Sequence, residues 1–365
     1  MNLDYNKDCD YYIKEEVRYD LYKKYNIFYV NKNIPLNEKI IKEMKKYIIV
    51  EFGDIFNQPI CDNLSIFKHN MEQNLIKELI FGACFNQPLY NLPVGLEEIT
   101  FGRDFNQSIE NLPSGIKKLH FDIYNKPIDN LPSSLKILKF EREFNQPINN
   151  LPGEIEEIYF GRDFNQPLYN NLPSKITKLT FGYYFNQPID NLPLGLEKLV
   201  FEGQFNQSVD NLPLKIQELI FGPSFNQPVD NLPLNIKKLI FDWNFNQPVD
   251  NLPPYIEYLT FGYKFNQPVD NLPSKIKEIK FRDNFNQPVD NLPPKLQKIT
   301  FGEKFNQPID NLPDSIEELT LGEDFNQTLG TNLPKMLKRL TISKNYTKTI
   351  IHIPIAVNII RNFLY

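Results

Sequence analysis

The residue types that most often carry catalysis or metal binding are few in this chain and are not grouped. The histidines and cysteines are scattered along the sequence: Cys9, Cys61, His69, Cys84, His120 and His352. They show no zinc-site spacing, and the chain contains no P-loop, dinucleotide-binding motif or nucleophile elbow. An odd number of cysteines without a CxxC pair indicates reduced thiols. These patterns predict that the protein is not an enzyme and that it needs no metal or cofactor.

Carboxylates are plentiful, and one set recurs at a fixed interval of 20 residues: Asp190, Asp210, Asp230, Asp250, Asp270, Asp290 and Asp310. Stacked about 4.8 Å apart, these side chains would repel unless each accepts hydrogen bonds. An Asx-type turn supplies such bonds locally. The alternative is a Ca²⁺ ladder, but the Gly-rich nonapeptides of Ca²⁺-binding β-rolls are absent. We therefore interpret this column as structural.

A second polar residue recurs in the same way, the asparagine of a repeated Phe-Asn-Gln, as at Asn226, Asn246 and Asn266. Such an asparagine can bond backbone groups of its own coil and of the next one, which forms a ladder. Ligand binding by these amides is the alternative. Because an identical polar residue in every unit suits architecture better, we predict the ladder.

All of these residues belong to one repeat of about 20 residues, for which Ile276 to Pro293 is a good copy. Fourteen copies of the Phe-Asn-Gln-Pro type lie between Phe56 and Phe325, and a partial fifteenth unit ends at Ile342. Period-2 alternation before the first Phe of each unit predicts a short strand. A frequent Gly after it lets the backbone turn, and two prolines per unit exclude a long helix.

Six apolar positions per unit cannot be buried within one coil, but stacked coils bury them as columns, two of which are phenylalanine. At roughly 1.5–3 kcal/mol for each large side chain, these columns would dominate stability. The sequence thus predicts a β-rich solenoid, a curved array of coils whose strands form a parallel sheet on the concave face. We expect these strands at Leu179–Phe181, Leu219–Phe221, Leu259–Phe261 and their equivalents.

The string Phe-Asn-Gln-Pro-Val/Ile-Asp-Asn-Leu-Pro resembles the FNIP repeat, a relative of the leucine-rich repeats that occurs in social amoebae and in giant DNA viruses. The resemblance covers about Phe52 to Ile342. It implies a leucine-rich-repeat-like solenoid with roles in protein interaction, and it implies no catalytic residue.

Three regions are expected: an N-terminal helical cap over 1–51, the repeat solenoid over 52–342, and a C-terminal cap over 343–365. Two short amphipathic helices would form the first cap, with these residues on their apolar faces: Ile13, Val17 and Leu21, then Ile40, Met44 and Ile48. Some members of the resembled family carry an F-box, so residues 1–51 could alternatively be a degenerate F-box remnant. The roughly 24 residues before Tyr25 are too few for a complete one.

Composition narrows the class of partner. A net charge of -5, from 40 basic and 45 acidic residues, argues against nucleic acid. The polar N-terminus lacks the features of a signal peptide. The longest apolar stretch, Ile350–Ile360, is interrupted and too short to span a bilayer. We therefore expect an intracellular, cytoplasmic protein (in the host cytoplasm if viral) that binds a protein rather than a membrane.

Within each strand, the residues beside the buried ones should face outward on the concave side. One outward column, from Glu98 to Arg339, is mostly charged with frequent changes of sign, which suits ion pairs between neighbouring strands. Exposed aliphatic and aromatic residues elsewhere suggest an interface, although Val and Ile also simply suit strands. The candidate partner-binding residues are Tyr183, Val200, Ile220, Ile240, Trp243, Tyr258 and Tyr263.

Two functions fit these features. The first is a non-catalytic scaffold that binds a macromolecular partner along the solenoid face. The alternative, which follows from the family resemblance, is a substrate-recognition subunit of a host cullin-type ubiquitin ligase. In that function residues 1–51 would contact the adaptor.

Overall fold

The computed structural model describes residues 27–30, 43–44, 46–59, 75–90, 92–169, 171–330, 332–348, 350 and 357–362. The chain divides into two compact units, Met1–Phe140 (unit 1) and Glu141–Tyr365 (unit 2). Within the described ranges, no helix is long and apolar enough to cross a membrane.

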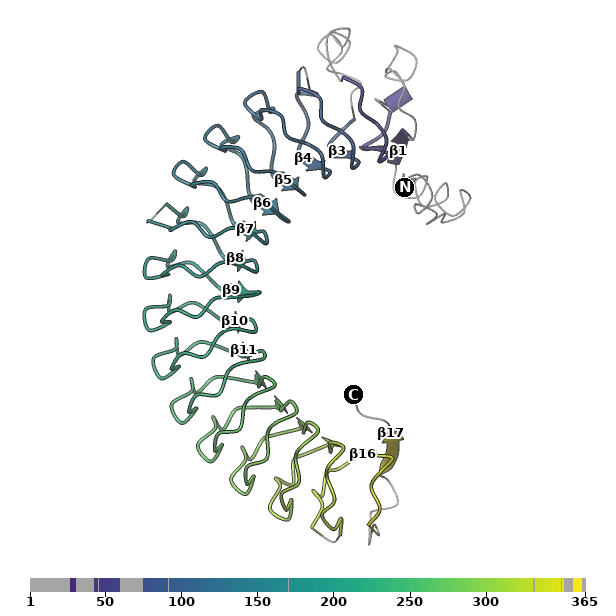
Figure 1. Ribbon diagram of the computed structural model, residues 1–365, viewed down its shortest axis with the longest axis vertical. Helices are drawn as coiled ribbons and strands as arrows, with labels where there is room; N and C mark the ends of the chain where they lie inside the picture. The colour runs from purple at the N-terminus through teal and green to yellow at the C-terminus, as the bar shows by residue number, and fades with distance from the viewer. Residues whose placement is uncertain are drawn as a thin grey trace, which may run out of the picture. The chain divides into compact units, whose positions relative to one another are not determined.

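Unit 1 contains one short strand per coil. Its strands are β1 (Ile27–Val30), β2 (Ile49–Phe52), β3 (Glu78–Phe81), β4 (Glu98–Phe101), β5 (Lys118–Phe121) and β6 (Ile137–Phe140). Each strand pairs in parallel with the next along the chain. The strands line the inner side of the coils, and the remaining segments loop away from them (Figure 1).

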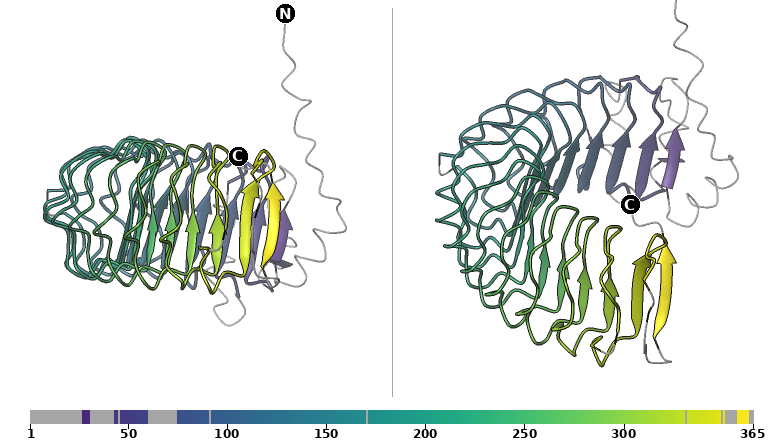
Figure 2. Two further views of the ribbon diagram at one scale, coloured as in Figure 1. Left: turned by 90° about the horizontal axis from the view of Figure 1, so that it is seen from below. Right: turned by 60° about the horizontal axis from the view of Figure 1, so that its bottom comes forward.

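Unit 2 repeats this arrangement. Its strands are β7 (Glu157–Phe160), β8 (Lys178–Phe181), β9 (Lys198–Phe201), β10 (Glu218–Ile220), β11 (Lys238–Ile240), β12 (Tyr258–Thr260), β13 (Glu278–Lys280), β14 (Lys298–Thr300), β15 (Glu318–Thr320), β16 (Arg339–Ser343) and β17 (Asn358–Asn362). All neighbouring pairs are parallel, and the strand arrows share one direction in Figure 2. This parallel solenoid confirms the expected fold class.

The strands form where the sequence alternates, because alternate side chains enter the coil. In β9, Leu199 and Phe201 are buried, whereas Lys198 and Val200 are only partly covered. Five of the six apolar columns are buried as expected, and the sixth, the leucine of Asn-Leu-Pro, is buried in some coils and half-buried in others, as at Leu112 and Leu151. In one coil of unit 2 the six residues are Ile236, Leu239, Phe241, Phe245, Val249 and Leu252, each at most 8% exposed.

Two phenylalanine columns form the centre of the core. Phe221 stacks on Phe225 of its own coil, with ring centroids 3.7 Å apart, and on Phe241 of the next coil at 5.6 Å. The second column continues from Phe225 to Phe245 at 6.1 Å. Because each ring contacts rings within and between coils, every coil depends on its two neighbours for burial.

The amide ladder predicted from the sequence is present. The backbone N–H of Asn246 donates to Oδ1 of Asn226 at 2.9 Å, and Nε2 of Gln247 donates to the carbonyl of Asn226 at 3.1 Å. The same bonds recur from coil to coil, as between Asn266 and Asn246. The asparagine of each coil therefore accepts the backbone N–H of the following coil, and the glutamine of that following coil donates a second hydrogen bond to the same asparagine.

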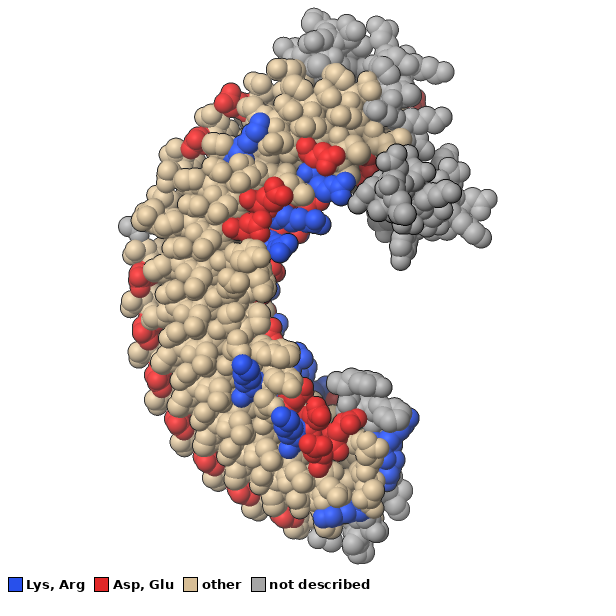
Figure 3. All heavy atoms as spheres, in the orientation of Figure 1, with Lys and Arg blue, Asp and Glu red and all other residues tan. Residues whose placement is uncertain are grey.

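The aspartate column is stabilised differently from our expectation of a local Asx turn. Oδ1 of Asp230 accepts a hydrogen bond from Nδ2 of Asn251 in the next coil at 3.0 Å, and Asp210 accepts one from Asn231 at 3.1 Å. Each carboxylate thus receives an amide donor between itself and the next carboxylate. Acidic side chains recur along the outer edge of unit 2 in Figure 3.

The glycine after the strand also has a different role from the one expected. No described glycine has a positive φ, so the turn does not require glycine for its backbone conformation. Instead, a Cβ added at Gly262 would lie 1.8 Å from the carbonyl oxygen of Asp242 in the preceding coil. Glycine here permits close stacking of adjacent turns.

The helical N-terminal cap is not supported by the described residues. Residues 27–30 form β1, which pairs with β2 through Ile27 and Ile49, and among the described residues of 1–51 helix is limited to Glu43 and Met44. The β-branched and aromatic run Ile-Phe-Tyr-Val suits a strand, and pairing satisfies its backbone groups. The first expected helix, with Ile13, Val17 and Leu21, lies outside the described residues.

Candidate interaction surface

The charged column of the sequence lies on the outward face of the strands and is largely neutralised by its own ion pairs. Glu218 in β10 contacts Lys198 of β9 at 3.2 Å and Lys238 of β11 at 2.8 Å. Partial burial raises the pKa of Glu218, but the hydrogen bonds from the two lysines outweigh it and hold the pKa below its usual value. This confirms the ion pairs expected between neighbouring strands and leaves little net charge for a partner.

Beside the charged column runs an aliphatic row made of Val200, Ile220 and Ile240. These three residues are paired in register on β9, β10 and β11, and their side chains are half-buried rather than enclosed in the coil. The row is bounded by Thr180 on one side and Thr260 on the other. The sheet face therefore carries an apolar strip three coils long.

The turns that follow the strands carry exposed aromatic rings. Trp243 stacks on Tyr263 with ring centroids 4.3 Å apart and an angle of 5° between the planes, and the indole is 49% exposed. Tyr183 lies edge-on to Tyr184 at 5.0 Å. Stacking across coils holds Trp243 in place, so it can offer a preorganised aromatic surface.

The two coils between these aromatic pairs carry small turn residues, Gly203 and Pro223. Gly203 is buried, and a Cβ there would lie 2.0 Å from the carbonyl oxygen of Tyr183. On the face of unit 2 drawn in Figure 3, the middle coils carry charged side chains only near their inner and outer edges, whereas charged side chains also gather on the face of the later coils.

The structure thus brings together only part of the candidate set. The aliphatic row is contiguous, and Trp243 and Tyr263 form a stacked pair. Tyr183 pairs instead with Tyr184, which the sequence analysis did not select. Tyr258 stands in the charged column between Lys238 and Glu278 and is 46% exposed.

One contact on the sheet face was missed at the sequence level. The hydroxyl of Tyr159 donates to Oε2 of Glu202, two coils away, at 2.8 Å. Burial, followed by this hydrogen bond, raises the pKa of Tyr159. Tyr159 occupies the same strand position as the aliphatic row, and that shared position in the repeat was the available signal.

A second feature that was missed is a leucine row made of Leu194, Leu214 and Leu234. These side chains are 83%, 73% and 61% exposed. Each follows the proline of Asn-Leu-Pro, in the turn that leads into a strand, where most other units have serine or proline. A leucine at this position in three successive units was the signal.

Chemically, these surfaces are suited to contact rather than to reaction. Within the ranges that the structure describes, no group of three or more His, Cys, Asp or Glu side chains could hold a metal ion. The described candidates combine apolar strips, aromatic rings and neutralised charges, which are typical components of protein interfaces.

Comparisons with known proteins agree with the repeat and the fold. A family model described as the FNIP repeat matches overlapping stretches from residues 85–122 through 185–224 and from 225–264 through 305–345. Among solved structures, the chain is similar to CroV588 of the giant virus CroV, described as a novel circular leucine-rich-repeat protein, at 31% identity and a TM-score of 0.66. That match covers 91% of this chain, which spans only 61% of the CroV588 chain.

YopM from Yersinia enterocolitica is similar at 17% identity with a TM-score of 0.54, and the match covers 87% of this chain and 80% of YopM. At that identity the likeness concerns the fold alone. No curated protein sequence matches the chain.

Proposed function

The chain belongs to the FNIP repeat family, and on this premise we propose that it is a non-catalytic scaffold that binds a protein partner on its strand face. The proposed contact residues are Tyr183, Val200, Ile220, Ile240, Trp243, Tyr258 and Tyr263. The leucine-rich-repeat-like solenoid is an architecture that typically serves in protein interaction.

The observation that carries this proposal is the aliphatic row. Three half-buried aliphatic side chains stand next to one another on β9, β10 and β11. In other coils the same strand position holds single apolar residues, such as Ile80 and Tyr159, or polar ones, such as Thr100, Lys280 and Thr300, but only here do three aliphatic residues follow one another among the described strands. Apolar side chains gathered on an exposed face are usually covered by a partner, and a stacked tryptophan in the turn after β11 is the type of residue that forms interface hot spots.

The proposal is tested with the combined substitution Val200→Ser, Ile220→Ser, Ile240→Ser and Trp243→Ala. A partner is first isolated with the full chain and identified, and its affinity is then measured by isothermal titration calorimetry. Since a hot-spot residue contributes about 1–2 kcal/mol or more, affinity should fall by at least about 100-fold. Circular dichroism should show that the coils remain folded, because these side chains face outward.

A matched control uses the same strand position in coils away from the row, Thr300→Ser and Thr320→Ser, which should leave affinity unchanged. Normal binding by the combined variant contradicts the proposal. Binding that survives this variant but is lost on deletion of residues 1–26 assigns recognition to the N-terminal segment, as the ubiquitin-ligase alternative requires. The deletion stops before Ile27 because β1 pairs with β2.

A further inference from the structure

The leucine row is a strongly exposed apolar feature among the described residues of unit 2, and the proposed strand-face site does not include it. Leu194, Leu214 and Leu234 are more than half exposed in three successive coils. The next coil continues the row with Pro254 and with Tyr255, whose ring is 46% exposed. An apolar strip of this length on a protein surface usually marks a contact site.

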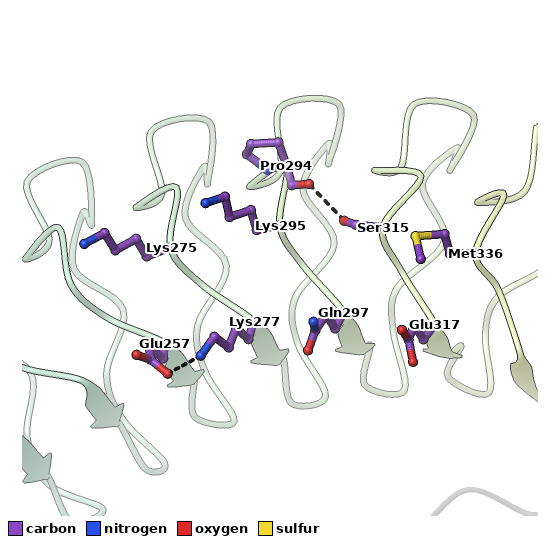
Figure 4. A pocket seen from close by; sticks show the side chains of 9 residues that line it. All are labelled: Glu257, Lys275, Lys277, Pro294, Lys295, Gln297, Ser315, Glu317 and Met336. Atoms are coloured by element: carbon purple, nitrogen blue, oxygen red, sulfur yellow. Dashed lines mark hydrogen bonds and ion pairs between the residues drawn. The ribbon is translucent and has the colours of Figure 1, made fainter.

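The row leads into a hollow of about 470 Å³ that is rich in lysine. Lys275, Lys277 and Lys295 line it together with Glu257 and Glu317, and Figure 4 shows Lys275 and Lys295 on successive coils beside it.

The two glutamates of the hollow are already neutralised. Glu257 pairs with Lys277 at 2.6 Å, and Glu317 pairs with Lys338 at 2.7 Å. Lys275 lies over the ring of Tyr255, with its Nζ 4.0 Å from the centroid. Within the described part of the chain, Lys275 and Lys295 make no ion pair with a carboxylate. Glu257 also interacts electrostatically with Lys275 at longer range. The hollow therefore presents two lysines without a close carboxylate partner at the end of the leucine row.

The spacing of the coils restricts what can lie along this surface. Parallel strands stack about 4.8 Å apart, and an α-helix advances about 5.4 Å per turn. A helix laid across the coils therefore places about one residue per turn over each coil. From Leu194 to Lys295 there are five coil spacings, or roughly 24 Å, which corresponds to about 16 helical residues.

We propose that this surface docks an amphipathic α-helix of a protein partner, with successive apolar residues over the leucine row and Tyr255, followed by acidic residues opposite Lys275 and Lys295. Burial of the leucines supplies the affinity. The carboxylates of the helix fix its register, because only one placement matches both apolar and basic coils. The surface is separate from the strand-face site, so either can fail without the other.

A second copy of the chain is a less suitable occupant. A two-fold contact along the row, centred on Leu214, would set Lys215 of one copy opposite Lys215 of the other. Like charges placed face to face oppose association.

The test uses the full chain and synthetic fluorescein-labelled peptides of about 20 residues in a helical alanine–glutamine background. In one peptide, leucines occupy positions i, i+4, i+7 and i+11, and glutamates occupy i+14 and i+18. A second peptide carries the same pattern in reverse order, so that both orientations of a bound helix are tested. Fluorescence anisotropy should show binding of a glutamate peptide. A peptide with lysine in place of glutamate should bind at least about tenfold more weakly, since two ion pairs are replaced by repulsion.

Two variants separate the contributions of the surface. The affinity for the glutamate peptide should fall by at least about tenfold in the triple variant Leu194→Ser, Leu214→Ser and Leu234→Ser. Lys275→Glu with Lys295→Glu should reverse the preference, so that the lysine peptide binds more tightly. Val94→Ser is the matched control, because Val94 occupies the same turn position in unit 1 and is 64% exposed, and it should change nothing.

Equal binding of the two peptides, or unchanged binding by the leucine variant, overturns the proposal. Sedimentation of the wild type as a dimer that the leucine variant converts to monomers also overturns it, since the occupant is then a second copy.

Discussion

Asparagine has two separate structural roles in most coils, and both act between coils. At Asn226 the side-chain oxygen accepts the backbone N–H of Asn246. At Asn251 the side-chain amide donates to Asp230 of the preceding coil. Apolar columns attract without direction, whereas these hydrogen bonds require one alignment of neighbouring coils. The polar ladders therefore fix the register that the phenylalanine columns stabilise.

Replacing Asn226 tests the ladder directly. Asn226→Ala removes the acceptor and leaves the N–H of Asn246 without its partner, so we expect the free energy of unfolding to fall by about 1–3 kcal/mol. Asn226→Asp keeps an acceptor oxygen and should cost less. Urea denaturation followed by tyrosine fluorescence measures both. Equal losses for the two variants would show that the side-chain oxygen is unimportant.

Tyr124 gives a second prediction, because in unit 1 it replaces phenylalanine in the second phenylalanine column, where it stacks on Phe105. Burial raises its pKa from 10.0 to about 12. The neutral phenol thus stabilises the fold fully below pH 10, and this contribution is lost as the pH rises to about 12. Tyr124→Phe should therefore lose less stability than the wild type between pH 10 and pH 12.

Thermal unfolding across this pH range measures the difference. At neutral pH the variant should match the wild type closely, since the hydrogen bond that the Tyr124 hydroxyl donates to the carbonyl of Gln107 is long, at 3.5 Å. Tyr90→Phe, at an exposed tyrosine of the same unit, is the control and should leave the alkaline loss unchanged. Parallel pH profiles for wild type and Tyr124→Phe would contradict the assignment.

At the scale of the element, the strands were predictable because they depend on their own residues. Alternation in Lys198–Phe201 places two side chains inside and two outside whatever the neighbouring coil contains. The amide partner of Asp230 was not predictable, because it belongs to the next coil and depends on how the two turns align. The strand β1 was not predicted; it lies between the two expected helices, and the β-forming run that starts at Ile27 was the available signal.

The same distinction applies to the candidate surface. The aliphatic row could be predicted, since strand alternation decides which way Val200, Ile220 and Ile240 face. The leucine row could not be predicted by that reasoning, because Leu194 lies in a turn where no periodicity fixes the side-chain direction. The position of Tyr183 relative to the row likewise depends on turn geometry.

Close stacking of turns yields a prediction about glycine. In Gly262→Ala the new methyl would lie 1.8 Å from the carbonyl oxygen of Asp242, a backbone atom that cannot move freely. The coils must shift, and we expect a loss of about 1–3 kcal/mol. Gly153→Ala is the matched control, because no atom lies within 4 Å of its added Cβ. Chemical denaturation should separate the two, and equal effects would refute the steric explanation.

Within unit 2, each strand from β8 to β16 pairs with the strand before it and the strand after it. In unit 2 the ring of Phe225 contacts Phe205 and Phe245, and β10 pairs with β9 and β11. The described pairing of β17 is with β16 alone. Stability in such arrays is approximately the sum of coil and nearest-neighbour interface contributions. A local defect should therefore weaken the nearest coils most.

Hydrogen exchange followed by mass spectrometry tests this expectation in the full-length protein. Phe225→Ala removes a fully buried ring and costs about 3–5 kcal/mol. Amide exchange should accelerate most in peptides containing β9, β10 and β11, and the effect should diminish toward β15. In the wild type, β16 and β17 should exchange faster than β10 to β12, because β17 has a described partner on one side only. Uniform acceleration throughout unit 2 would instead mean that the coils of this unit unfold as one cooperative block, and the nearest-neighbour description would then be wrong.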